Sequence, residues 1–199
     1  MLAESISVAL LVTDVLDTLG IPYAIGGSLS SAVHGVMRAT MDVDLVADLD
    51  QEHVEPLAQA LGDAFYADAG MMHDAVRHHS SFNVIHLETM FKVDVFVAKP
   101  RAFDRAQLAR RQLHLLSEEP ERRAYVTSAE DVVLAKLDWY RMGGEVSDRQ
   151  WRDALGVLKV QGERLDRAYL KQMAADLGVS DLLSQALLDA GMWRGDSVE

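Results

Sequence analysis

Residues 24–46 read AIGGSLSSAVHGVMRATMDVDLV and hold the features from which the architecture of this chain can be worked out. The segment predicts a short strand that ends at Gly26-Gly27, a short helix over 29–35 closed by a glycine, and a second strand in MDVDLVAD. Side chains two positions apart in a strand point the same way, so Asp42 and Asp44 share one face. Two carboxylates this close repel each other, which indicates either solvent exposure or a nearby positive charge.

The rest of the chain contains both strand and helix patterns, and its composition changes near residue 120. Apolar spacing predicts helices at 2–19, 50–65 and 101–110, strands at 81–87, 90–98 and 112–117, and a loop with a short helix at 67–80. After residue 126 the pattern is helical throughout, beginning with an N-cap at Thr127 or Ser128. We therefore predict an α+β part over 1–125 followed by a helical part over 126–199.

A third acidic residue lies on a later predicted strand, KVDVFV, where Asp94 faces away from the three valines. If this strand neighbours the one that carries Asp42 and Asp44, three carboxylates converge. Such a cluster is unfavourable without a cation, and Mg²⁺ prefers hard oxygen ligands. Two such ions can hold both the attacking and the leaving oxygen of a phosphoryl displacement. The three aspartates are thus candidate ligands of a two-metal site.

The glycines upstream supply a second component of the candidate site. Gly26, Gly27 and Ser28 fall between a strand and a helix, where the backbone can approach a phosphate closely and Ser28 can donate from its hydroxyl. Arg38 is the only Lys or Arg among the first 76 residues and precedes Asp42 by four positions. It is interpreted as a phosphate ligand or as a brace for Asp42.

Composition excludes several classes of function. The 199 residues include no cysteine, so the chain has neither disulfides nor a thiolate metal site, and the cytoplasm is the expected location. No apolar run is long enough to span a bilayer, no secretory signal is apparent, and no membrane association is expected. The net charge of -12 argues against broad, non-specific binding of nucleic acid.

The set GGS, DVD and a later single Asp resembles the nucleotidyltransferase superfamily typified by DNA polymerase beta. The longer pattern GGSLSSAVHGVMRATMDVDLV is similar to small bacterial nucleotidyltransferases, including those that act as toxins in toxin–antitoxin and abortive-infection systems. Two looser matches follow, EDVVLAKLDWYR with its lysine and SDRQWRDALGVL. The resemblance covers about residues 20–160 and implies a small mixed β-sheet core with flanking helices.

The resemblance also implies a reaction. An acceptor hydroxyl would attack the α-phosphorus of an NTP, ATP for example, and release pyrophosphate. Gly27 and Ser28 would bind the β- and γ-phosphates, Lys136 would reach the triphosphate, and the metals would bind the aspartates already named. Asp94 would also help to deprotonate the acceptor, which could be a protein, a tRNA end or a small molecule. A cognate antitoxin or self-association is a possible further interaction.

Other interpretations stay open at this stage. One alternative is a non-catalytic nucleotidyltransferase-like module that binds nucleotide or regulates a partner, as an antitoxin does. A second is a phosphatase of the Asp-x-Asp-x-(Thr/Val) class, although those enzymes need a hydrophobic strand before the first Asp. Asp148 and Asp153 are interpreted as helix-surface acids. Four histidines could suggest zinc but lack a clear ligand spacing: His73, His78, His79 and His86.

Overall fold

The computed structural model describes residues 2–37 and 42–192 and divides into two compact units. The sheet unit comprises the described residues of Met1–Leu29 and Arg38–Thr127, and the helical unit comprises those of Ser30–Met37 and Ser128–Glu199. The α+β class expected from the sequence is confirmed, because one mixed sheet and several helices account for the described residues.

The sheet has seven strands in the order β3-β4-β5-β2-β1-β7-β6. Two pairings are parallel, β1 with β7 and β2 with β5, and the others are antiparallel. The strands are β1 (Tyr23–Ile25), β2 (Asp42–Ala47), β3 (Phe65–Tyr66), β4 (Ser81–His86), β5 (Lys92–Val97), β6 (Gln112–Glu118) and β7 (Glu121–Val126). The mixed sheet agrees with the core that the family resemblance implies.

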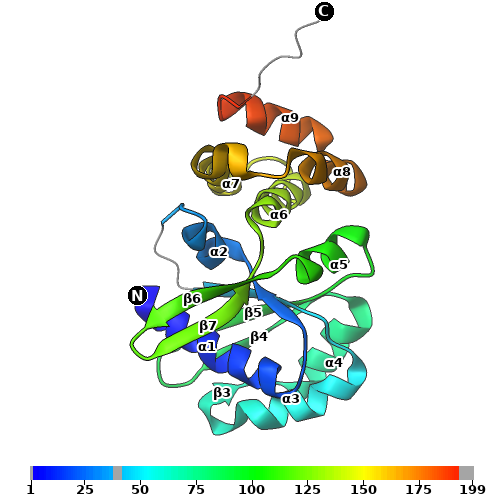
Figure 1. Cartoon of the computed structure of the whole chain (residues 1–199). Helices are drawn as coiled ribbons and strands as arrows, with labels where there is room; N and C mark the ends of the chain where they lie inside the picture. Colours follow the sequence, from blue (N-terminus) through cyan, green and yellow to red (C-terminus); the bar gives the residue numbers. More distant parts are fainter. Residues whose placement is uncertain (1, 38–41, 193–199) are drawn as a thin grey trace, which may run out of the picture. The chain divides into compact units, whose positions relative to one another are not determined.

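Four α-helices and two short 3-10 helices belong to the sheet unit. They are α1 (Leu2–Thr18), α3 (Val54–Leu61), α4 (Ala69–His78) and α5 (Ala102–Ala109), with η1 (Gln51–His53) and η2 (Gly62–Ala64) at either end of α3. Helix α1 contacts β2, β7 and α3, whereas α4 contacts α3 and β4. In the view of Figure 1, α1, α3 and α4 lie below the central strands and α5 lies above them.

The helical unit consists of α6 (Ala129–Met142), α7 (Asp148–Gln161), η3 (Gly162–Arg164), α8 (Arg167–Leu177) and α9 (Ser180–Asp189). Helix α6 contacts α7, α8 and α9, and its apolar residues Val133, Leu134 and Leu137 are fully buried. Ser128 caps α6 by accepting the backbone N–H of Asp131, which confirms one of the two caps considered from the sequence.

The helical unit also contains residues Ser30–Met37, which come much earlier in the sequence than its other helices. Helix α2 (Gly27–Val33) begins in the sheet unit, and the residues that follow its first turn group with α7. A Cβ on Gly156 of α7 would come within 2.6 Å of a Val36 methyl group. Gln161 donates from its side-chain amide to the carbonyl oxygen of His34 at 2.9 Å. The contact division falls after Thr127 and places residues 30–37 with the later helices, and the boundary predicted after residue 125 stays a prediction.

Two elements were missed by the sequence patterns. Strand β7 is rich in charge (ERRAYV), and it forms because it pairs with both β6 and β1. The two-residue strand β3 is too short to show a pattern. The uncertain region at 67–80 contains a regular helix, α4, capped at its start by Asp68.

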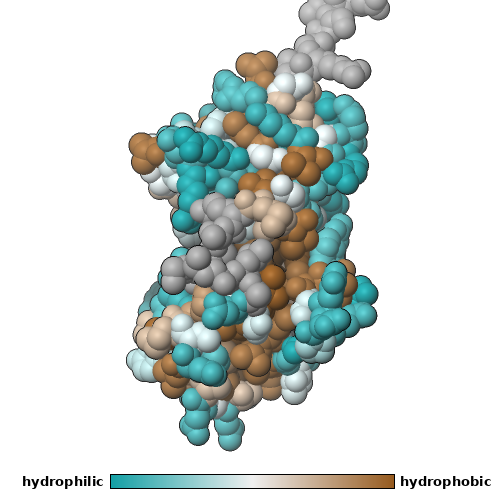
Figure 2. Space-filling view, turned by 90° about the vertical axis from the view of Figure 1, so that its left-hand side faces the viewer, coloured by the Kyte–Doolittle hydropathy of each residue, from teal (hydrophilic) through white to brown (hydrophobic). Residues whose placement is uncertain are grey.

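The surface carries both polar and apolar side chains. Hydrophilic residues cover much of the face in Figure 2, with apolar residues between them. In the helical unit, Trp139, Met142 and Val146 are among the large apolar side chains that are exposed. None of the helices in the described ranges is long and apolar enough to cross a membrane.

Candidate active site

Strands β2 and β5 bring the acidic residues together. The strands run parallel, with Asp44 directly opposite Asp94 and Asp42 opposite Lys92. The intervening residues Val43 and Val93 are completely buried on the other face of the sheet. Alternation of side chains along each strand therefore places all three aspartates on one face, as the sequence predicted on the condition that these strands are neighbours.

The row of polar groups extends to a third strand. Asn83 of β4 lies opposite Asp94 in an antiparallel register, and both residues are partly buried. Asp44, Asp94 and Asn83 consequently form one line across three adjacent strands. The sequence analysis missed Asn83, because only the pairing of β4 with β5 puts it beside an acid.

Lys92 is a second residue that the sequence analysis missed. Its Nζ lies 2.8 Å from Oδ2 of Asp94, and about 40% of the lysine side chain and 22% of the aspartate side chain are exposed. The hydrogen bond to Asp94 raises the pKa of Lys92, and the charges of Asp94, Asp42 and Asp44 add to the effect, against the opposing effect of burial. The spacing of two residues between Lys92 and Asp94 on one strand was the available signal.

The glycine loop lies directly against the acids. The backbone N–H of Gly26 donates to the carbonyl oxygen of Asp44 at 2.8 Å. Gly27 has a φ of 56°, and a Cβ there would stand 1.7 Å from Oδ2 of Asp44. Only glycine fits, because the position combines a left-handed backbone with a carboxylate in the space a side chain would take. Ser28, next in the chain, is 5% exposed.

The donor set has the chemistry that Mg²⁺ prefers, namely carboxylate oxygens on a rigid sheet. In the described part of the chain, however, no three His, Asp or Glu side chains are arranged as a ready metal cluster. The positive charge nearest to Asp94 is instead the ammonium of Lys92. The residues are compatible with a metal in type and in strand register, and their side chains are not preorganised around one.

Two predicted nucleotide-binding residues remain predictions. Arg38 lies outside the described residues. Lys136 is on α6 in the helical unit, where it is 5% exposed and its Nζ lies 3.0 Å from Oδ2 of Asp153. Asp153 was expected on the helix surface but is buried, because it neutralises this lysine, whereas Asp148 is exposed as expected.

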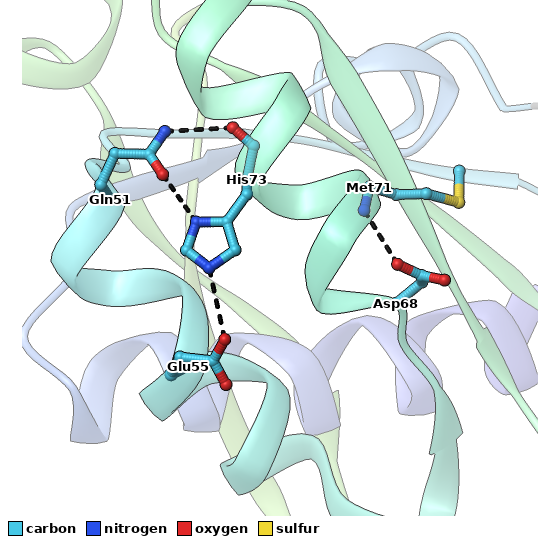
Figure 3. Close-up of polar contacts among 5 residues, drawn as sticks. All are labelled: Gln51, Glu55, Asp68, Met71 and His73. Carbon is cyan, nitrogen blue, oxygen red and sulfur yellow. Dashed lines mark hydrogen bonds and ion pairs between the residues drawn. The ribbon is translucent and has the colours of Figure 1, made fainter.

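The four histidines considered for zinc have separate partners. His73 contacts the side-chain oxygen of Gln51 at 2.6 Å and Glu55 at 3.3 Å, and Gln51 donates back to the His73 carbonyl (Figure 3). These contacts join α4 to η1 and α3, beside the cap that Asp68 makes to the backbone N–H of Met71. The other three rings contact different groups, namely Asp74 for His78, the Ala98 carbonyl for His79 and Thr89 for His86. Each ring is thus accounted for by local structure.

Comparison with known proteins gives a likeness of fold. No protein-family model matches the sequence, and no curated protein matches it. The structure is similar to the crystal structure of an antigenic nucleotidyltransferase-like protein from Paracoccidioides brasiliensis, with a TM-score of 0.56 and 20% sequence identity over 93% of each chain. The chain therefore has the fold of a nucleotidyltransferase-like protein.

Proposed function

We propose that this chain is a magnesium-dependent nucleotidyltransferase, which transfers an NMP from an NTP to an acceptor hydroxyl and releases pyrophosphate. The observation that carries the proposal is the arrangement of β2, β5 and the glycine loop. Asp44 of β2 lies opposite Asp94 of β5 across parallel strands, and the Asp44 carboxylate occupies the space that a Cβ on Gly27 would fill. Because this glycine loop packs against the paired acids, a phosphate held by its backbone would lie next to metal ions held by the carboxylates. The nucleotidyltransferase-like fold supports the same class.

Each residue has a role in the proposed reaction. Asp42, Asp44 and Asp94 would hold two Mg²⁺ ions, which would neutralise charge on the phosphates and lower the pKa of the attacking hydroxyl. Asp94 would in addition accept the hydroxyl proton. The Gly26–Ser28 loop would hold the β- and γ-phosphates, so that the α-phosphorus faces the acceptor and pyrophosphate leaves from the opposite side.

The acceptor would be a protein side chain, a tRNA end or a small molecule in the cytoplasm. The net charge of -12 favours an acceptor that is not a long nucleic acid. A toxin role, with a cognate antitoxin or self-association as control, would follow from the likeness of the sequence to toxin-type enzymes. ATP is the first nucleotide to test.

The test is transfer of label. The purified protein is incubated with Mg²⁺ and each α-labelled NTP in turn, with and without cell extract, and label on macromolecules and small molecules is followed. We expect transfer by the natural chain and by Asp63→Ala, a control that removes an exposed carboxylate on η2. Transfer should be lost in Asp42→Ala and in Asp94→Ala.

Other outcomes distinguish the alternatives. Binding of nucleotide without transfer to any acceptor would favour the non-catalytic module. Release of phosphate from monoesters, without nucleotide transfer, would favour the phosphatase. Transfer that persists in Asp94→Ala at the natural rate would refute the assignment of the site.

A further inference from the structure

The face that carries the three aspartates also carries one lysine, and the two strands fix their order. Asp42 and Lys92 form one cross-strand pair of the parallel β2–β5 ladder, and Asp44 and Asp94 form the pair two residues further on. The ammonium of Lys92 reaches along its own strand to Asp94, at 2.8 Å. Four charged groups thus occupy two successive levels of one face, three negative and one positive.

The backbone of this lysine cannot move away from the acids. Val93 is completely buried and Val95 is 2% exposed, so β5 is held by its apolar face between β2 and β4. The lysine stem and ammonium are 40% exposed, and only rotation about the side-chain bonds separates the ammonium from Asp94. Lys92 can therefore exchange partners without any change in the sheet.

A divalent cation at Asp94 would take the oxygen that Lys92 now holds. A divalent cation bound to Oδ2 of Asp94 would lie close to the Lys92 ammonium, and the repulsion between these two positive charges in a partly buried site would weaken the contact of the ammonium with Asp94. The ammonium would then have to turn towards another anion. In the proposed function, this anion is the triphosphate of an NTP bound at the neighbouring glycine loop.

We propose that Lys92 is an internal counter-cation. Its ammonium competes with the metal for Asp94, and it turns to contact the nucleotide phosphates when the metal binds. This inference rests on the proposed function and names a positioning residue within the same site. It makes binding of metal and nucleotide mutually dependent: metal alone meets the competing ammonium, whereas metal with nucleotide gives that ammonium a new partner.

The experiment measures metal and nucleotide affinity separately, without turnover. Mn²⁺ binding is followed by electron paramagnetic resonance of the free ion at low salt, first alone and then with a non-hydrolysable α,β-methylene NTP. The variants are Lys92→Met, which keeps the stem and removes the charge, and Lys92→Arg, which keeps the charge. Arg77→Met, on the exposed side of α4, is the control for loss of a positive charge elsewhere in the sheet unit.

We expect Lys92→Met to bind Mn²⁺ alone about tenfold more tightly and the NTP analogue about tenfold more weakly than the natural chain. Lys92→Arg and Arg77→Met should leave both affinities close to the natural values. The Mn²⁺ effect should shrink at 1 M salt, since the lysine is partly exposed. In an Asp94→Asn background the Lys92→Met change should no longer tighten Mn²⁺ binding, because the carboxylate for which the lysine and the metal compete is already absent.

The outcomes separate this inference from the function on which it rests. Mn²⁺ affinity that is unchanged or weaker in Lys92→Met overturns the competition, while metal binding by the natural chain leaves the proposed function intact. A tightening that persists in Asp94→Asn also overturns it, because the effect would not act through that carboxylate. Failure of the natural chain and all variants to bind Mn²⁺, alone or with the analogue, refutes both.

Discussion

Replacement of Gly27 by alanine tests the closeness of the glycine loop to the acids. The φ of 56° places Gly27 in the left-handed region, where a Cβ costs about 1–2 kcal/mol. The added Cβ would also stand 1.7 Å from Oδ2, 2.5 Å from Cγ and 2.8 Å from Cβ of Asp44, so the aspartate side chain must turn or the strand must shift. We expect a total loss of about 3 kcal/mol in the free energy of unfolding.

Gly20→Ala is the matched control. Gly20 has a φ of 68° in the same sheet unit, and a Cβ there would meet nothing within 4 Å, so alanine incurs only the backbone cost. At about 2–4 °C per kcal/mol for a chain of this length, thermal unfolding should show a drop of about 2–8 °C for Gly20→Ala and a clearly larger one for Gly27→Ala. Only Gly27→Ala should lose Mn²⁺ binding, because only there is Asp44 displaced.

The opposite result would refute this reasoning. If Gly27→Ala unfolds at the temperature of Gly20→Ala and still binds Mn²⁺ and nucleotide with the natural affinities, Asp44 does not occupy the space beside Gly27. Circular dichroism measured before heating confirms that both variants have folded, so that a loss of binding can be assigned to the site.

Three further predictions concern pairs elsewhere in the chain. Lys136→Met should lower the free energy of unfolding by about 3–5 kcal/mol in chemical denaturation, because it leaves the buried carboxylate of Asp153 without its partner. Adding Asp153→Leu to this variant should restore much of the lost stability. Loss of nucleotide binding without loss of stability would instead favour the predicted contact of Lys136 with a triphosphate. The hydrogen bonds from Arg141 lower the pKa of Asp181, so the pair's stabilisation is present above about pH 4 and lost as the pH falls through the lowered pKa. Asp181→Asn should flatten that acid limb in denaturation curves between pH 2 and about pH 6, and an unchanged limb would contradict the pairing. Burial, followed by the charge of Asp17, raises the pKa of Tyr23. Stability should therefore fall as the pH rises above about 10, where this tyrosine ionises only in the unfolded chain. Tyr23→Phe should remove this loss, and alkaline denaturation of both chains measures it.

The strands of the site were predictable because their pattern is local. In DVDLVA and KVDVFV the buried and partly exposed positions alternate as the letters suggest, so Asp44 and Asp94 could each be placed on the polar face of a strand. Strand β7 could not be predicted, because its charged residues carry no apolar alternation and its pairing with β1 and β6 forms it.

The burial of Lys136 and Asp153 was also beyond the sequence. Either residue alone is typical of a solvated helix face, and burial of a charge is tolerated only where a partner of opposite sign is close. The two lie on different helices, α6 and α7, and the packing of those helices creates the pair. The packing of residues 30–37 on α7, through Val36 and Gly156, could not be predicted from the sequence either, because it joins segments far apart in the chain.

By itself, the sequence determined which residue types the site has and which face of its own strand each one takes, since side-chain alternation depends only on the backbone within a strand. Tertiary structure alone decided that β2 lies parallel to β5 in the register that sets Asp44 against Asp94. It also decided that the Gly27 backbone touches Asp44 and that the ammonium of Lys92 binds Asp94. The physical reason is that register and contact between strands depend on hydrogen bonds and packing between residues far apart in the chain, which no local pattern encodes.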